Sequence, residues 1–398
     1  MRARHAVPLR APKFRYKQEK LNEKYPSPRI AAQQLTITPF AVTVDMMKKL
    51  ENILKIPLIN LAIVLITAGL GASLLGCGSR IGNLPSDSVG TNFIGIEQLG
   101  DNKKPNEDNG IVYTLYGGHI DIAHARICAD WTNRFAKKSF ECLMQGNNYY
   151  EENFQSNTFR VEFTYPSNWN TLPNKKKIAK KIAVNSAPVF SFNMATWHEI
   201  STWFGYETTG ILSEFNSAFS WEDSYSNLLG CHSAYHALLK DKLSFDNAFT
   251  IAFNKELKKL KILDADSAKQ ASEKVQDKWY KGKLFTFGFA EIYKRNFDIG
   301  LKNGIVTPFL VPDFPDNKSV KPKPYPVPTL RTLSKHNFSA RFLIIPHFPQ
   351  KDKILEIVSP SKNREYIEPD KDFRKIMEII EQEGIHLFGP NVNKPDLK

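Results

Sequence analysis

The chain has 398 residues, which suits one large domain or two modest ones, and its 42% hydrophobic and 12% aromatic residues are enough for a substantial core. The net charge of +13 lies mainly at the N-terminus: residues 1–45 carry +6, residues 46–76 carry +2, and +5 remains from Cys77 onward. No basic stripe interleaved with aromatic residues follows, so the sequence argues against nucleic acid as a partner.

A secretory signal is the most specific pattern in the chain. The basic head "MMKKLENILK" (46–55) precedes the apolar run "IPLINLAIVLITAGL" (56–70), and "LLGC" (74–77) ends the segment. This order predicts a signal peptide over residues 46–76. Leu-Leu-Gly-Cys resembles the lipobox of bacterial lipoproteins, in which the cysteine is diacylated, for example with palmitate.

We therefore expect a lipid on Cys77 that anchors the protein in a membrane of the bacterial envelope. Gly78 stands where an Asp would resemble an inner-membrane retention signal, so the outer membrane, facing the periplasm, is favoured. An ordinary transmembrane helix is the alternative, because the apolar run is nearly long enough to span a bilayer.

The signal sets the domain boundaries. Residues 1–45 are interpreted as a non-native upstream extension, because a signal peptide is expected at the start of its protein. They are rich in Arg, Lys and Pro without clear periodicity, which predicts disorder. Residues 77–110 are rich in small and polar residues and predict a flexible tether. Residues 111–398 are predicted to form a single globular domain, helical over 111–300 and mixed strand and helix over 301–398. The expected fold class is α+β, a predominantly helical body with a few short strands.

Periodicity and end signals predict the elements of this domain in chain order. Phe159, Val161 and Phe163 alternate with polar residues as in a half-buried strand, and Ser220 with Asp223 forms a capping-box pattern. Helices are expected over about 119–145, 174–184, around His198, 220–240, 244–261, 265–280 and 370–384, the last ending at Gly384. Strands are expected near 158–166, 304–312, 338–346 and 353–358, with an extended Pro-rich crossing at 321–330.

The candidate metal-ligating and catalytic residues are concentrated between residues 119 and 236, where five of the nine histidines lie. Asp121 and His124 share one helical stripe with Cys128 and Trp131, whose apolar members indicate a buried face. Asp-x-x-His on one face is how helical bundles present metal ligands. The two residues are therefore either metal ligands or a structural hydrogen-bonded pair.

"ATWHEISTWFGYET" (195–208) raises a second metal hypothesis. His198 and Glu199 open a zinc-hydrolase-like His-Glu pair, but Thr202 stands where its second histidine would be. If His198 binds zinc, Glu199 is the candidate general base that deprotonates a metal-bound water. The alternative is a tryptophan-rich core helix that carries a His-Glu pair.

Further candidates are weaker. His232 and His236 have two-ligand spacing, and Asp130 and Glu222 are additional carboxylates. Cys231 would need His124 or His198 as its base in a thiol hydrolase. A Cys128–Cys142 bridge is compatible with an oxidising periplasm, but sequence alone does not pair cysteines.

Three strings, "YGGHIDIAHARICADWT", "WHEISTWFGYE" and "FSWEDSYSNLLG", resemble the bacterial lipoprotein family catalogued as domain of unknown function 4056. The resemblance covers most of the chain from about residue 111. The family name assigns no activity, so it implies no catalytic role for any residue. The resembling strings contain Asp121, His124, Asp130, Trp131, His198, Glu199, Trp203, Gly205, Glu222 and Asn227.

These observations lead to one function hypothesis and one competitor. The first is an outer-membrane lipoprotein that is a metal-dependent hydrolase of an envelope component. Asp121, His124 and His198 would bind a divalent metal, with zinc favoured, and Glu199 would be the base. The competitor is a non-catalytic envelope scaffold or binding lipoprotein, in which the Asp/His/Glu residues form a structural network.

Overall fold

The computed structural model describes residues 110–207, 215–240, 242–281, 291–315, 320–361 and 363–396. The predicted extension, signal peptide, Cys77 and most of the tether lie outside these residues. All described residues belong to the same compact unit. Within them, no helix has both the length and the apolar character needed to cross a membrane. The architecture is the α+β class predicted from the sequence, with long helices and several small sheets.

A short hairpin leads into the first long helix. Strands β1 (Ile111–Thr114) and β2 (Gly118–Asp121) pair antiparallel, and helix α5 (Ile122–Gln145) follows directly. The helix was predicted to begin near residue 119. It begins three residues later because the side chain of Asp121 accepts hydrogen bonds from the first free N–H groups, as an N-cap does.

A three-stranded antiparallel sheet has the order β3-β4-β9. Strand β3 (Tyr149–Phe154) and strand β9 (Ser339–Pro346) flank strand β4 (Asn157–Thr164), whose alternating residues Phe159, Val161 and Phe163 are buried as predicted. Phe342 of β9 stacks on Phe190 of a long helix. The sheet thus packs its apolar face on the helices.

Helix α6 (Lys175–Trp203) is one continuous element where the sequence suggested two helices. Pro188 lies inside it and removes one backbone donor. Both neighbours, Ala187 and Val189, are buried, and Phe190 contacts Phe135 of α5. This packing keeps the helix continuous across the proline. The helix runs from exposed lysines at its start into the core at its end.

Three further helices follow as predicted. Helix α7 (Asp223–Leu238) packs on α5, α6 and α8 (Phe245–Lys259), and α9 (Ala265–Val275) contacts β1. Half of the predicted capping box is present: the N–H of Ser220 donates to Oδ2 of Asp223 at 2.8 Å. The other half is wrong, because the helix begins at Asp223 with Glu222 at its N-cap and has no side-chain cap hydrogen bond. The Ser220–Asp223 bond fixes the turn before α7 to the first residue of the helix.

The C-terminal part differs from the prediction in three places, one of which is the strand expected near 304–312, where only Ile305–Val306 form a strand. Residues Lys351–Val358 form helix α10 and not a strand, because Ile354, Leu355 and Val358 lie on one helical face, and α10 packs on α11. Helix α11 (Pro369–Phe388) continues through Gly384. A Cβ at Gly384 would lie 2.6 Å from the ring of Phe297, so this glycine permits close packing and does not end the helix.

The remaining elements are short. They are the 3-10 turns η3 (Trp169–Thr171) and η4 (Leu330–His336), the strand pair β5 (Tyr280–Lys281) and β6 (Glu291–Ile292), and the pair β7 (Ile305–Val306) and β8 (Tyr325–Pro326).

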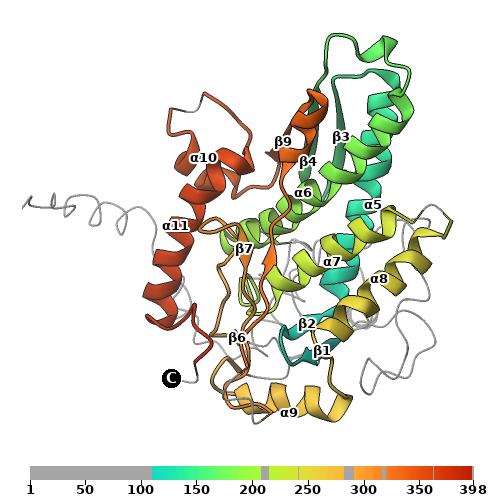
Figure 1. Cartoon of the computed structure of the whole chain (residues 1–398). Helices are drawn as coiled ribbons and strands as arrows, with labels where there is room; N and C mark the ends of the chain where they lie inside the picture. Colours follow the sequence, from blue (N-terminus) through green and yellow to red (C-terminus); the bar gives the residue numbers. More distant parts are fainter. Residues whose placement is uncertain are drawn as a thin grey trace, which may run out of the picture. The chain divides into compact units, whose positions relative to one another are not determined.

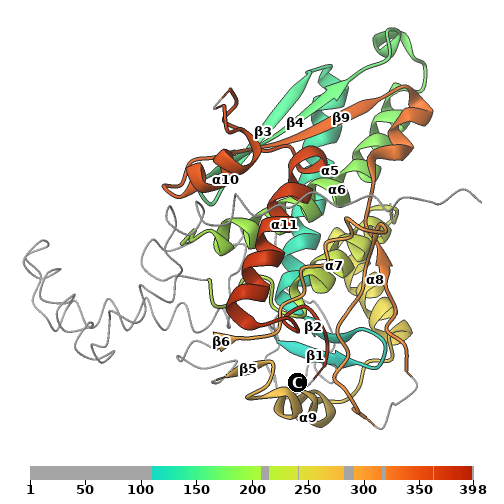
Figure 2. The same ribbon diagram turned by 90° about the vertical axis from the view of Figure 1, so that its left-hand side faces the viewer.

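Figures 1 and 2 show the arrangement from two sides. The β3-β4-β9 sheet lies at one end of α5 and α6, and the β1-β2 hairpin lies at the opposite end, next to α9. Helices α5, α6 and α7 meet in the interior between these ends, and their mutual contacts are among the most extensive in the described residues. The chemistry predicted from the sequence falls on these three helices.

Candidate metal centre

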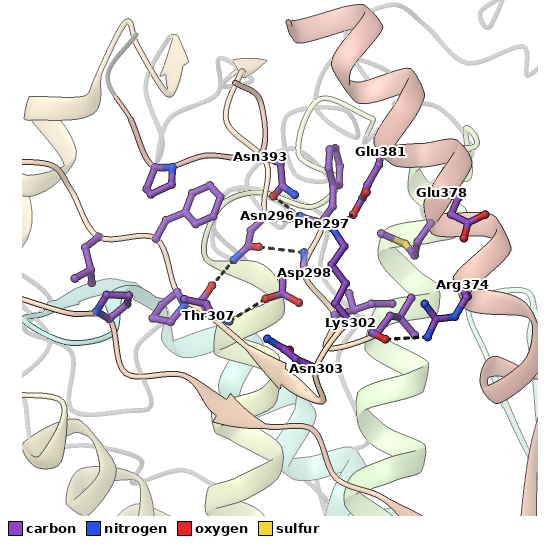
Figure 3. A pocket seen from close by; sticks show the side chains of 18 of the residues that line it. Asn296, Phe297, Asp298, Lys302, Asn303, Thr307, Arg374, Glu378, Glu381 and Asn393 are labelled. Carbon is purple, nitrogen blue, oxygen red and sulfur yellow. Dashed lines mark hydrogen bonds and ion pairs between the residues drawn. The ribbon is translucent and has the colours of Figure 1, made fainter. Parts of the chain in front are cut away.

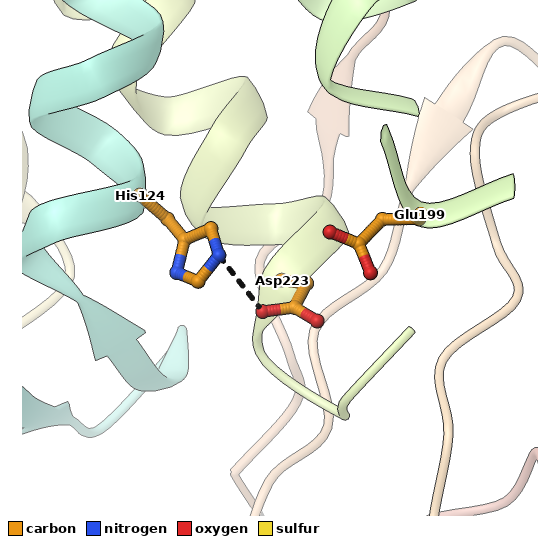
Figure 4. Close-up of side chains that lie close together, drawn as sticks. All are labelled: His124, Glu199 and Asp223. Carbon is orange, nitrogen blue, oxygen red and sulfur yellow. Dashed lines mark ion pairs between the residues drawn. The ribbon is translucent and has the colours of Figure 1, made fainter. Parts of the chain in front are cut away.

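Three potential ligands come together in the interior, one from each of these helices. His124 of α5, Glu199 of α6 and Asp223 of α7 each offer a nitrogen or oxygen atom, and these atoms all lie within 4.8 Å of one another (Figure 4). The residues are only 4%, 1% and 3% exposed, respectively. We call these three residues the ligand group.

Asp121 orients the histidine of the ligand group. Nδ1 of His124 donates to Oδ2 of Asp121 at 2.8 Å, while Oδ1 of the same carboxylate caps the start of α5. The other ring nitrogen, Nε2, lies 3.6 Å from Oδ1 of Asp223. Fixing Nδ1 on a carboxylate directs Nε2 to the ligand group, as commonly occurs behind metal-bound histidines.

A single turn orients both carboxylates. The N–H of Phe219 donates to Oε2 of Glu199 at 2.7 Å, and the next N–H, of Ser220, donates to Oδ2 of Asp223. Phe219 has a φ of 56°, a left-handed conformation that is costly for an aromatic residue. Strain of this kind persists where the surroundings enforce it, often at functional sites.

The charges of the ligand group shift the pKa values of His124 and Asp223. Burial alone would lower the pKa of His124, but the nearby Asp121 and Asp223 carboxylates outweigh it and raise the pKa to about 10. Burial raises the pKa of Asp223 to about 6, although His124 opposes the change. Without a metal, His124 and Asp223 therefore form a buried imidazolium–carboxylate pair at neutral pH.

One separation in the ligand group already fits a metal ion. Ligand atoms about 2.0–2.2 Å from a tetrahedral zinc lie roughly 3.3–3.6 Å apart, which matches the 3.6 Å between His124 Nε2 and Asp223 Oδ1. The same separation is long for a hydrogen bond. The other two pairs of ligand atoms lie within 4.8 Å, a range that small side-chain movements can close. One imidazole and two carboxylates are a donor set that divalent metals accept. The ligand group can thus hold a metal ion.

Of the ligands predicted from sequence, the structure places His124 in this group and Asp121 directly behind it. His198 faces another side of α6, where it lines a cavity of about 10 Å³ with Asn157 and Ser201. Its Nε2 has no hydrogen-bond partner among the described residues, and burial, with His124 nearby, lowers its pKa to about 3. Adjacent helical residues point about 100° apart, so Glu199 enters the group and His198 does not.

Two other predicted carboxylates have different surroundings. Glu222 is buried next to Asp223. Burial, together with Asp223 and Asp121, raises the pKa of Glu222 to about 8, so it is mostly neutral at neutral pH. Asp130 lies one turn along α5 from Arg126, whose Nη2 approaches it to 3.2 Å. Asp130 therefore belongs to an ion pair outside the ligand group.

The remaining histidine candidates are also outside it. His232 bonds through Nε2 to the carbonyl of Pro326 at 2.7 Å, and His236 is exposed. His119 accepts from the indole of Trp221 at 3.2 Å and bonds to Ser272 at 3.1 Å. His232 and His119 are thus held by hydrogen bonds to other parts of the chain, outside the ligand group.

The structure excludes the Cys128–Cys142 bridge that the sequence left open. Cys128 and Cys142 lie on α5 fourteen residues apart, which is about 21 Å along the helix and far beyond disulfide reach. The Sγ of Cys128 instead donates to Oδ1 of Asn227 at 3.1 Å. Cys231 is buried, and the neighbours that lower the pKa of its thiol, against burial, are Cys128, Ser191 and Thr132; no histidine is among them.

From the sequence, Asp223 was one of several candidate carboxylates and was assigned to the helix cap, whereas the structure places it in the ligand group. The sequence did not indicate Arg295, a wholly buried residue in no recognisable motif, which contacts the turn that orients both carboxylates.

A separate cavity of about 450 Å³ lies between residues 296–310 and α11 (Figure 3). Its volume suits a small molecule. However, Asp298 accepts from the N–H groups of Gly300 and Thr307, Arg374 donates to the carbonyl of Leu301, and Lys302 lies 3.5 Å from Glu381. The chain itself engages these polar groups, so the cavity does not identify a ligand.

The protein is thus an α+β protein with a buried His/Glu/Asp group. Residues 88–307 match the family model described as "Protein of unknown function (DUF4056)". The match covers more than half of the 398 residues, so the chain belongs to this family, as its resemblance predicted. No curated protein and no solved structure matches the chain.

Proposed function

We propose that this protein is a metal-dependent hydrolase of a bacterial envelope component, anchored to the membrane by a lipid on Cys77. The observation that carries the proposal is the convergence of His124, Glu199 and Asp223 within 4.8 Å. The three residues lie on separate helices, and a second residue or an N–H group orients each of them.

In this proposal the ligand group holds the ion and the surrounding residues orient the ligands. His124, Glu199 and Asp223 would hold the ion, and a divalent metal there would supply a bound water with a pKa lowered towards about 7. Asp121 keeps Nε2 of His124 directed at the ion, and the N–H groups of Phe219 and Ser220 hold the carboxylates. Glu199, predicted from sequence as a base, is proposed here as a ligand.

Zinc is the favoured ion, because it accepts both imidazole nitrogen and carboxylate oxygen at about 2.0–2.2 Å and keeps an open position in catalytic sites. Manganese and iron also accept this donor set. The identity of the bound metal must therefore be determined by elemental analysis of the purified protein.

The membrane anchor rests on the 46–77 segment. Substitution Cys77→Ser should abolish incorporation of a labelled fatty acid and release the protein from the outer-membrane fraction. Cys142→Ser is the control, since Cys142 is buried in α5 and should leave labelling unchanged. Unchanged labelling of the Cys77→Ser protein would exclude the lipid anchor.

One observation favours a non-catalytic alternative. All three ligand-group residues are nearly inaccessible to solvent. Buried, fully paired groups can serve only to fix three helices in place. In that alternative the protein is an envelope scaffold, with or without a structural metal.

Metal content with an activity measurement separates these functions. The purified protein is analysed by elemental mass spectrometry and then incubated with isolated envelopes to detect soluble products. His124→Gln should lose both metal and products, whereas His119→Gln, the buried control, should keep both. Bound metal without products supports the scaffold. Absence of metal after reconstitution with zinc, manganese and iron excludes the metal-dependent function.

A further inference from the structure

Arg295 is a buried cation next to the ligand group. It is fully inaccessible to solvent, and its guanidinium packs against the rings of Trp203, Phe215 and Phe388, with 4.6 Å to the Phe388 centroid. Among the described residues it forms no ion pair with a carboxylate. An unpaired buried charge is costly unless hydrogen bonds and nearby opposite charge offset the burial.

The hydrogen bonds of Arg295 go to the turn that orients the carboxylates. Nη1 donates to the carbonyl of Ala218, and Nη2 donates to the carbonyl of Asn216 and to that of Ile292, both at 3.2 Å. The guanidinium thus spans from the residues just before Phe219 to the strand that precedes Arg295. A planar fork with several donors is suited to such a clamp.

The backbone around Arg295 holds the same turn from its other end. Arg295 forms an antiparallel bridge with Ser220, and the N–H of Asn296 donates to the carbonyl of Phe219 at 3.0 Å. Phe219 and Ser220 are the two residues whose N–H groups bind Glu199 and Asp223. The strained φ of Phe219 is therefore enforced by contacts with residues 295 and 296.

The charge of Arg295 matches the needs of a metal-bound site. Burial lowers the pKa of Arg295 to about 9, opposed by Asp223 and Glu199, so the group remains protonated at neutral pH. With neutral His124 and ionised Asp121, Glu199 and Asp223, a divalent ion leaves a net charge of −1. The guanidinium brings the buried assembly to neutrality.

We infer that Arg295 is a positioning residue of the metal site. It clamps the 216–220 turn so that two successive N–H groups orient Glu199 and Asp223. Its positive charge offsets the one negative charge that remains when a divalent ion is bound among Asp121, Glu199 and Asp223. This inference rests on the proposed metal function. It assigns Arg295 no contact with the ion.

The test compares Arg295→Met and Arg295→Lys with wild type, and uses Lys294→Met as a matched control. Lys294 is the neighbouring buried cation, but its ammonium binds Asp396 and the carbonyl of Asn391, away from the ligand group. Zinc affinity is measured by competition with a chromophoric chelator, and folding is measured by circular dichroism. Bound Co²⁺ reports ligand geometry through its visible spectrum.

We expect Arg295→Met to weaken zinc binding by about tenfold to a hundredfold, the usual effect of losing an outer-shell partner. Arg295→Lys keeps the charge without the fork, so it should bind zinc with intermediate affinity and show an altered Co²⁺ spectrum. Lys294→Met should lose thermal stability while keeping wild-type zinc affinity and spectrum.

If Arg295→Met does not fold, Arg295→Lys decides the question. A folded Arg295→Lys protein with wild-type affinity and an unchanged Co²⁺ spectrum overturns the positioning role and leaves the metal function intact. A wild-type protein that binds no metal overturns the metal function itself, and the positioning role with it.

Discussion

Asp121 and His124 stand one helical turn apart, and the carboxylate of Asp121 binds the helix start with one oxygen and the imidazole of His124 with the other. The N-cap residue of α5 therefore also sets the orientation of a potential metal ligand. Asp121 contributes both to the formation of the helix and to the arrangement of the site.

Substituting Asp121→Asn should separate these two roles. Asparagine still caps a helix, so the folded structure should persist, but it lacks the negative charge behind His124. Metal affinity should fall by about tenfold to a hundredfold. The control is Ser244→Ala, which removes the cap of α8 at a cost of about 1 kcal/mol and should leave metal affinity unchanged. Isothermal titration with zinc and thermal unfolding measure the two effects.

The neighbours His198 and Glu199 provide a direct test of the ligand set. Glu199→Gln should abolish stoichiometric metal binding, because it removes a charged ligand of the group. His198→Gln should retain metal, because His198 lines a separate small cavity. Elemental mass spectrometry of both folded variants gives the answer. Loss of metal in His198→Gln alone would restore the ligand set predicted from sequence.

Close contact between α5 and α7 should be needed for the site. A Cβ at Gly230 would lie 2.1 Å from the carbonyl oxygen of Ala125, so Gly230→Ala must push apart the helices that carry His124 and Asp223. We expect a loss of about 1–3 kcal/mol in unfolding free energy and weaker metal binding.

Ser233→Ala is the matched control on the same helix. Its buried Oγ has no hydrogen-bond partner in the described part of the chain, so removing it should be neutral or slightly stabilising. Chemical denaturation measures both variants. Equal stability of the two proteins would contradict the close-packing argument.

The metal-free protein should lose stability as pH rises. The folded-state pKa of His124 is raised from 6.5 to about 10, so its contribution to stability is complete below pH 6.5 and is lost as the pH approaches 10. The proton on Nε2 also competes with a metal, so metal binding should strengthen over the same range. Thermal unfolding in a chelator, compared with His124→Gln, checks this. A pH-independent difference between the two proteins would contradict it.

Sequence periodicity correctly predicted the helices and strands that have one buried face and one exposed face. Strand β4 alternates because one face meets the helices, and Phe373, Ile376 and Ile380 of α11 form one buried stripe. The errors arose where a residue type has two uses. Gly384 suggested a helix end but provides space for Phe297, and Pro188 lies within a helix that its buried neighbours keep continuous.

The site was only partly predictable for a related reason. The Asp121–His124 spacing is a local signal, and it identified one ligand, His124, and the carboxylate that orients it. The choice between His198 and Glu199 depends on which face of α6 meets α5 and α7, which local sequence does not encode. Asp223 and Arg295 lie 99 and 171 residues beyond His124, so only the packed fold reveals that they belong together.

Strand β9 pairs with β4 along all eight residues from Asn157↔Pro346 to Thr164↔Ser339, yet it lies outside the region that matches the family model. A fragment ending at residue 307 would therefore leave the edge of β4 without its partner strand, next to the buried residues Phe159, Val161 and Phe163. Exposed edges of this kind recruit strands from other molecules. The family segment alone should self-associate, and soluble protein should require residues up to at least the end of β9.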